Sequence, residues 1–251
     1  MKKIIKYLFL LTGGSFILAS CNDFLDREPL DSVTPDNFFF TENDLAAYAV
    51  KHYNFTTHEG FNAGIWKNDN ATDNQAATDY DKKWIPGQWK VPEAYDNPAS
   101  NDPWYFSTIR EANYFLETVV PRFEKGEIEG SETNIKHYIG EMYFLRAKNY
   151  LSKLETFGDF PIIKNTLPDE SESLIQASKR APRYKVAHFI LEDLDQAISL
   201  LTNNISGGKN RITKNAALLL KSRAALFEAS WLTYHKGTAL VPGCLLYTSP
   251  S

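Results

Sequence analysis

The sequence predicts an all-α domain, and two features of its pattern carry this prediction. Apolar residues recur at steps of three and four along residues 132–157, which is the spacing of one face of a helix. Other stretches show the same period, and residues that begin or end helices separate them. With 251 residues, the chain can bury a sizeable core in one large domain or two small ones.

Residues 132–157 are predicted to form the central helix. Its apolar positions cover far more than a single stripe, so we expect it to be buried among other helices. Gly140 and Ala147 carry almost no side chain and would let a neighbouring helix approach closely. Gly158 and Pro161 end the helix, because glycine accepts positive φ at low cost and proline cannot continue a helix. The expected inner face comprises Ile139, Tyr143, Ala147, Tyr150, Leu154 and Phe157.

Residues 1–20 are predicted to be a lipoprotein signal peptide. Lysines at its start precede an apolar run that is too short to be a comfortable membrane-spanning helix. Small residues then precede Cys21, as in the bacterial lipobox, so Cys21 would carry the acyl chains after cleavage. Each buried CH₂ contributes about 0.8 kcal/mol, and several chains therefore anchor a protein stably. The alternative is a secretory peptide with a chance cysteine. Residues 21–40 are expected to be an extended tether.

Further helices are predicted on both sides of the central one. The first begins after Thr41, which can form a capping box with Asp44. The last begins after Thr213 as its N-cap. A polar connection is expected at 165–181. The other predicted helices cover residues 104–123, 183–203 and 214–234.

Residues 56–103 show no sustained periodicity and are rich in Asn, Asp, Gly and Pro. A long irregular stretch within a compact domain is usually functional or disordered, and large aromatic residues argue against disorder. Two interpretations remain open. The rings either pin a long loop onto the helical body or form a binding platform. These rings belong to Trp66, Tyr80, Trp84, Trp89 and Tyr95.

A sugar would suit such a platform, because the apolar C–H face of a pyranose lies flat on Trp or Tyr. Its hydroxyl groups need donors and acceptors, which the polar residues 69–75 offer. Asp69 and Asp73 also suggest calcium, but the spacing lacks the glycine and final glutamate of an EF-hand loop. The predicted ligand-binding residues are Trp66, Asp73, Asn74, Trp84 and Trp89.

Composition excludes several classes of function. The net charge is −4 and no Lys/Arg cluster is paired with aromatics, so nucleic acid is not an expected partner. The 2 cysteines cannot build a disulfide framework or a Cys-based zinc site. The 5 histidines form no HExxH motif. We therefore expect neither a metal nor a cofactor.

Several motifs follow one another in a fixed order. They are CNDFLD at 21–26, WYFSTIREAN at 104–113, GEMYFLRA at 140–147, FGDFPI at 157–162, DLDQA at 193–197 and RITKNAA at 211–217. Any one of them is weak, but the ordered set is specific. It resembles the SusD/RagB family, the nutrient-binding outer-membrane lipoproteins of Bacteroidetes.

The resemblance implies an all-α fold of tetratricopeptide-like helix pairs, to which the residues of this chain add a long irregular aromatic-rich loop. It also implies no enzymatic activity. Such proteins form a lid over a SusC-type TonB-dependent transporter in the outer membrane and capture oligosaccharides, or peptides in some members. Their ligand site is variable, so no binding residue is carried over by motif. Residues 41–243 would be the N-terminal helical domain of such a protein.

One departure concerns the end of the chain. Family members are much longer, and residues 244–251 resemble a translated sequencing adapter more than a protein terminus. We therefore expect a truncated gene model with a non-native tail at 244–251. In that case the last helices would lack a cover for their apolar faces.

Two competing functions remain open. A tetratricopeptide-like scaffold that binds proteins or peptides is favoured if the rings of the loop are buried. A glycoside hydrolase needs two carboxylates at a set separation, and nothing singles out a pair among Asp69, Asp73 and Asp79.

Glu141 and Arg146 are expected to make structural hydrogen bonds, and Asp159 to accept from backbone N–H groups in its turn.

Overall fold

The computed structural model describes residues 38–53, 55, 71–72, 75–76, 104–205, 210–238 and 240–241. The chain divides into two compact units, Met1–Phe38 and Phe39–Ser251, and the description below concerns the second unit. In its described part, six helices carry the structure, which confirms the all-α prediction. The helices are α2 (Glu42–Lys51), α4 (Ser107–Lys125), α5 (Glu132–Phe157), α6 (Ser171–Ala177), α7 (Arg183–Leu200) and α8 (Lys214–Tyr234).

Two short strands, β1 (Ala71–Thr72) and β2 (Gln75–Ala76), form an antiparallel pair. In its register Ala71 lies opposite Ala76 and Thr72 opposite Gln75. A two-stranded pair of this length has little stability of its own. The helices therefore carry the fold.

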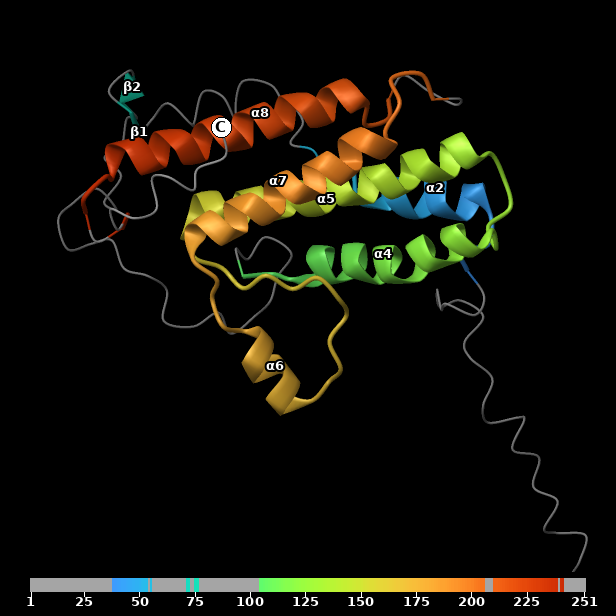
Figure 1. Cartoon of the computed structure of the whole chain (residues 1–251), viewed down its shortest axis with the longest axis horizontal. Coiled ribbons are helices and arrows are strands. Elements are labelled where there is room, and N and C mark those ends of the chain that lie inside the picture. The colour runs from blue at the N-terminus through green and yellow to red at the C-terminus, as the bar shows by residue number, and fades with distance from the viewer. Residues whose placement is uncertain are drawn as a thin grey trace, which may run out of the picture. The chain divides into compact units, whose positions relative to one another are not determined.

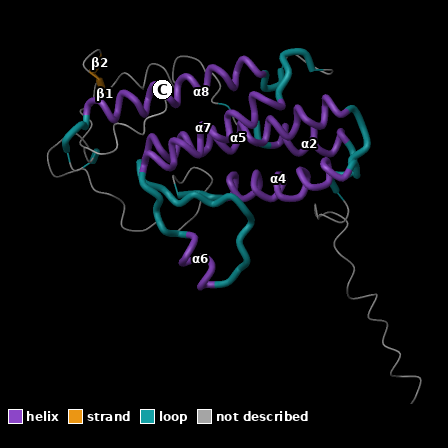
Figure 2. Tube along the Cα trace, in the orientation of Figure 1, coloured by secondary structure: helices purple, strands orange, loops and turns teal. Residues whose placement is uncertain are grey.

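Helix α5 is the centre of the unit, and it contacts α2, α4, α7 and α8 (Figure 1). Its residues are buried on almost every side, as the breadth of its apolar surface predicted. Tyr150, Met142 and Leu154 are among its fully buried side chains. The tube view shows that α4 and α7 run along α5, with α8 beyond α7 (Figure 2).

Gly140 allows the close contact between α5 and the end of α7. A Cβ atom at this position would lie 3.0 Å from Leu201 Cγ and 3.2 Å from the Leu201 backbone nitrogen. Both distances are shorter than ordinary van der Waals contacts. The prediction that a small residue here admits a neighbouring helix is confirmed.

Helix boundaries follow the predicted signals. Thr41 forms a capping box with Asp44, and the Thr213 hydroxyl accepts a hydrogen bond from the Ala216 amide. Gly126 ends α4 with φ of 70°, and Gly158 ends α5 with φ of 73°. Glycine adopts such angles without the steric cost that a side chain would add.

The structure differs from the predicted elements at three places. Trp104, predicted to lie in a helix, precedes α4, and its ring packs on Phe157 with centroids 4.2 Å apart. Helix α7 ends at Leu200 and not at residue 203, because Leu201 is extended and buried. Within the predicted polar connection 165–181, residues Ser171–Ala177 form α6. Helix α6 buries no residue. Its sequence therefore needs no apolar face, and the periodic pattern that predicts a helix is missing.

Several predictions concern residues outside the described ranges. These are the signal peptide, Cys21, most of the tether, nearly all of the aromatic loop and the proposed tail at 244–251. None of the described helices has both the length and the apolar character needed to cross a membrane.

Candidate functional site

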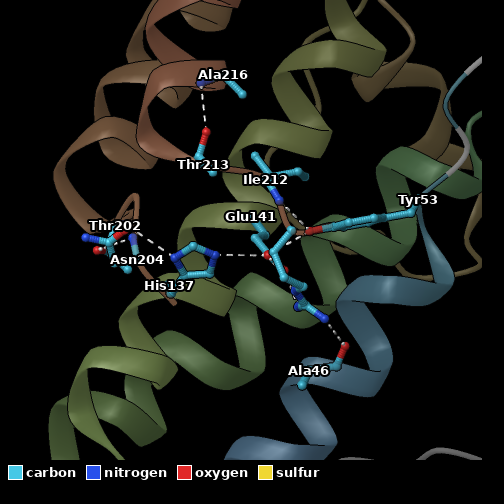
Figure 3. Close-up of polar contacts among 10 residues, drawn as sticks. Ala46, Tyr53, His137, Glu141, Thr202, Asn204, Ile212, Thr213 and Ala216 are labelled. Carbon is cyan, nitrogen blue, oxygen red and sulfur yellow. Dashed lines mark hydrogen bonds and ion pairs between the residues drawn. The ribbon is translucent and has the colours of Figure 1, made fainter. Parts of the chain in front are cut away.

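Glu141 is the centre of a buried polar cluster that joins α2, α5 and the segment before α8 (Figure 3). Its carboxylate accepts from the Tyr53 hydroxyl at 2.7 Å and from Arg211 Nε at 2.8 Å, and it also pairs with Arg211 Nη2. His137, one turn earlier on α5, lies 3.1 Å from the same carboxylate through Nε2. Both Glu141 and His137 have fully buried side chains.

Backbone groups complete this cluster. The Thr202 amide donates to His137 Nδ1 at 3.2 Å, so the ring must carry its proton on Nε2 when it is neutral. Arg211 donates to the Ala46 carbonyl at 3.3 Å, and the Ile212 amide donates to the Tyr53 hydroxyl at 3.0 Å. The cluster thus fixes both ends of the connection between α7 and α8 against α5.

A cluster of Glu, His, Tyr and Arg could suggest acid–base chemistry. In this cluster, however, the polar side-chain groups already pair with one another. Burial raises the pKa of Tyr53, with the nearby Glu141 charge acting in the same direction. A tyrosine with a raised pKa is a poorer acid near neutral pH. None of the four side chains lines either cavity described below. We interpret the cluster as a structural clamp, as expected for Glu141.

Arg146 forms the second clamp. Its guanidinium makes a bidentate pair with Asp193 of α7, with Nε–Oδ2 and Nη2–Oδ1 distances both 2.7 Å. Nη1 also donates to Asn113 Oδ1 of α4 at 2.9 Å. Because such a fork uses both carboxylate oxygens, Arg146 joins α4, α5 and α7 through fixed geometry. The prediction of a structural role for Arg146 is confirmed.

Asn113 and Tyr150 hold the segment that follows α5. The Asn113 amide donates to the carbonyls of Ile163 and Asn165 at 2.8 and 3.3 Å. The Tyr150 hydroxyl accepts from the Ile163 amide at 2.9 Å and lies 3.2 Å from the Ile163 carbonyl. Burial raises the pKa of Tyr150 to about 12. These contacts place the Ile163 region as one wall of a cavity.

This α4–α6 cavity has a volume of about 370 Å³, which lies within the usual range of small-molecule sites. It is bounded by α4 with the residues before it, the segment after α5, and α6 with its flanks. The lining is mainly aromatic and aliphatic. It consists of Trp104, Phe106, Ile109, Arg110, Asn113, Pro161, Ile163, Asn165, Leu167, Leu174 and Ser178.

A second cavity of about 370 Å³ lies beside the end of α5 and is lined by residues of both charges. Next to it, Arg183 Nε binds Glu228 at 2.7 Å and the Arg183 amide donates to Asp159 Oδ1 at 2.7 Å. Asp159 thus accepts from a backbone N–H group, as predicted, but this group belongs to the first residue of α7 and not to the turn that contains Asp159. Arg183 Nη2, Glu228 Oε1 and Trp231 Nε1 are buried without a partner among the described residues. Burial raises the pKa of Glu228 despite the pairing with Arg183.

The predicted ligand-binding residues are not placed by the structure. Trp66, Trp84 and Trp89 lie outside the described ranges, as do Asp73 and Asn74, the two residues between β1 and β2 in the sequence. These five residues remain predictions. In the part of the chain that is described, no group of three or more His, Cys, Asp or Glu side chains is placed to hold a metal ion.

Sequence reasoning did not find the α4–α6 cavity. Its walls come from segments far apart in the sequence, and Trp104 and Ile163 are ordinary apolar residues in their own segments. The sequence motifs contain both residues of the Glu141–Arg211 pair but do not predict that the two residues meet. Arg211 opens the RITKNAA motif and Glu141 belongs to GEMYFLRA, but their pairing is a long-range contact that neither motif specifies.

A protein-family model described as "Starch-binding associating with outer membrane", the SusD-like family, matches residues 23–226. The chain belongs to this family. The match covers α2 through most of α8, so it includes both clamps and the α4–α6 cavity. The resemblance to the SusD family deduced from ordered motifs is thereby confirmed.

Curated SusD-like relatives come from Formosa agariphila. The SusD-like protein P38 is 27% identical over 203 residues, which are 79% of this chain and 37% of the relative. The SusD-like protein P25 is 23% identical over 243 residues, covering 92% of this chain and 44% of the relative. The chain therefore spans less than half the length of these relatives.

Solved SusD-like structures share the helical fold. A SusD-like protein from Bacteroides fragilis aligns with a TM-score of 0.60 at 25% identity, covering 82% of this chain and 38% of that one. A SusD-like carbohydrate-binding protein from the same species aligns with a TM-score of 0.52 at 19% identity, covering 77% and 39%. The helical arrangement around α5 is thus the arrangement of SusD-like proteins.

Proposed function

We propose that this SusD-like chain captures oligosaccharides at the cell surface and delivers them to a SusC-type TonB-dependent transporter. One observation carries the proposal: a family described as starch-binding and outer-membrane-associated matches residues 23–226. The relatives are more than twice as long as the matched region, so the proposal concerns the protein as a whole.

The loop 56–103 is the proposed contact surface for the glycan. Its tryptophans offer flat apolar faces, and Asp73 and Asn74 offer hydrogen-bonding groups. Sugar recognition needs both, because one face of a pyranose is apolar while its hydroxyls require partners. No catalytic step is assigned to the chain.

Cys21 is the proposed lipid attachment site. It follows an apolar run with small residues at its end, which is the pattern of the bacterial lipobox. Attachment to the outer membrane would keep the binding domain near a transporter. This arrangement agrees with the family description, which associates these proteins with the outer membrane.

Calorimetric titration with a panel of oligosaccharides tests the proposal. We expect the chain to bind at least one glycan, and Trp66→Ala, Trp84→Ala or Trp89→Ala to lose about 1–3 kcal/mol of binding free energy with the fold intact. Far-UV circular dichroism of each variant checks the fold. If all three variants bind as the wild type does, the loop is not the platform. Absence of binding to every glycan contradicts the assignment of ligand class.

A tetratricopeptide-like scaffold is the second candidate, and the outer face of α8 favours it. Leu219 and Leu226 lie two turns apart on this helix and are 73% and 69% exposed. Leu218 and Tyr234 are exposed on the same helix. Helices with an unburied apolar face commonly receive an apolar face of a partner helix. Pull-down with amphipathic helical peptides, compared with Leu219→Lys and Leu226→Lys variants, distinguishes this function from glycan capture.

A further inference from the structure

The α4–α6 cavity combines an apolar interior with one charged side chain. Trp104 and Phe106 contribute rings, and Ile109, Ile163 and Leu167 contribute aliphatic groups. Among the described residues that line it, there is no Asp or Glu. A ligand that fills this cavity must therefore present mostly apolar surface, because buried hydroxyl or amide groups would lose hydrogen bonds to water without replacement.

Arg110 supplies the charge of the lining. It is exposed on the first turn of α4, and its guanidinium makes no hydrogen bond or ion pair within the described part of the chain. The side chains of Asn113 and Ser178 are already occupied, whereas no hydrogen bond of the exposed Asn165 side chain is found within the described residues. Asn113 uses its amide and carbonyl groups on Ile163, Asn165 and Arg146, and the Ser178 hydroxyl donates to the Ile175 carbonyl.

We propose that the α4–α6 cavity binds an apolar group that carries a carboxylate. The ring or branched body of such a ligand would fill the apolar interior, and its carboxylate would pair with Arg110. A guanidinium matches a carboxylate in charge and in the fork geometry of its donors. A free aromatic acid and the C-terminal aromatic residue of a peptide share this chemistry.

None of the residues proposed to bind the glycan is among the described residues that line this cavity. Its lining offers few free hydrogen-bonding groups for the hydroxyls of a neutral sugar, so we expect sugars to bind poorly here. The inference rests on the geometry of α4, α6 and the segment between α5 and α6. It stands whether or not residues 56–103 bind oligosaccharides.

The first test compares charged and neutral probes on the full chain. Calorimetric titrations with 2-naphthylacetate and with its neutral amide, 2-naphthylacetamide, isolate the contribution of the carboxylate. We expect the amide to bind about tenfold more weakly, because a charge-assisted pair is replaced by a neutral contact. Equal affinity for the two probes, or no binding of 2-naphthylacetate at millimolar concentration, would overturn the proposal.

The second test assigns the binding to the cavity with matched variants. Arg110→Gln is expected to weaken 2-naphthylacetate about tenfold, whereas Lys125→Gln removes a positive charge from the far end of the same helix and leaves affinity unchanged. Leu174→Trp narrows the cavity and should abolish binding. Ile175→Trp changes the neighbouring residue of α6, which does not line the cavity, and should not affect binding. The reverse pattern in either pair contradicts the assignment.

A third titration separates the two sources of the ligand. The dipeptide acetyl-Gly-Phe has the same apolar ring and carboxylate at the end of a peptide chain. Binding of acetyl-Gly-Phe that depends on Arg110 would identify a peptide terminus as a ligand. Binding of 2-naphthylacetate alone would restrict the site to free acids. Oligosaccharide titration of Arg110→Gln shows separately whether glycan capture depends on this cavity.

Discussion

At the scale of single residues, the described part of the molecule is held by buried ion pairs whose members come from segments far apart in the sequence. Glu141 and Arg146 lie on α5 and reach Arg211 and Asp193, 70 and 47 positions away in the sequence. Burying an ion costs several kcal/mol, and the pair offsets that cost only when the geometry is good. Removing one partner should therefore be far more harmful than removing an exposed charge.

Glu141→Gln tests this at the first clamp. The substitution keeps the shape of the side chain but leaves Arg211, whose side chain is 14% exposed, without its counter-charge. We expect a loss of about 3 kcal/mol in the free energy of unfolding, measured by urea denaturation. Glu132→Gln, which removes an exposed carboxylate paired with Lys136 on the same helix, should leave the midpoint unchanged. Similar midpoints for the two variants would mean that the clamp contributes little.

His52 is expected to make stability depend on pH. Its side chain is 7% exposed, and burial lowers its pKa below the ordinary 6.5, although Glu111 acts in the opposite direction. Between the lowered folded pKa and 6.5, the unfolded chain binds a proton that the folded chain does not. The free energy of unfolding should therefore fall as the pH decreases below about 6.5.

Urea denaturation at a series of pH values, for the wild type and His52→Gln, measures this effect. The glutamine side chain does not titrate, so the variant should lose less stability than the wild type as the solution is acidified. Parallel pH profiles for the two proteins would assign the acid sensitivity to other groups.

At the scale of elements, the packing of α5 against the end of α7 depends on the absence of a side chain at residue 140. Gly140→Val places branched carbons where a Cβ already lies 3.0 Å from Leu201. Overpacking of this kind costs about 2 kcal/mol. Ser152→Val, at an exposed position of the same helix, adds a β-branched residue without the clash and should change stability by less than about 0.5 kcal/mol. Thermal unfolding of both variants gives the comparison.

The contrast between α5 and α6 shows which elements a sequence pattern can predict. Helix α5 has 26 residues, an apolar surface on most sides and a glycine at its end, so its bounds were predicted from local signals. Helix α6 has 7 residues and buries none of them, so the periodic signal was missing. Its exposed Leu174 acquires a role only as part of the α4–α6 cavity.

At the scale of the whole molecule, α8 presents an apolar outer face. It has 21 residues, and Ala217, Ala224, Glu228 and Leu232 are the ones buried. Exposed apolar patches of this kind promote association between molecules. We expect the chain to self-associate as its concentration rises, and Leu219→Lys with Leu226→Lys to reduce this association without loss of unfolding free energy. Sedimentation velocity measures the first quantity and urea denaturation the second. Unchanged association in the double variant would assign it to another surface.

Local patterns in the sequence were enough to predict the all-α class, the bounds of α5 and α8, the caps at Thr41 and Thr213, and the SusD-like family. These features depend on local spacing and on motifs that are contiguous in the chain. The tertiary structure alone decided that Glu141 pairs with Arg211, that Arg146 pairs with Asp193, and that Arg110 borders an apolar cavity. Such contacts join segments separated by tens of residues, and they exist only after the helices have packed around α5, since no local pattern records which distant side chain will meet which.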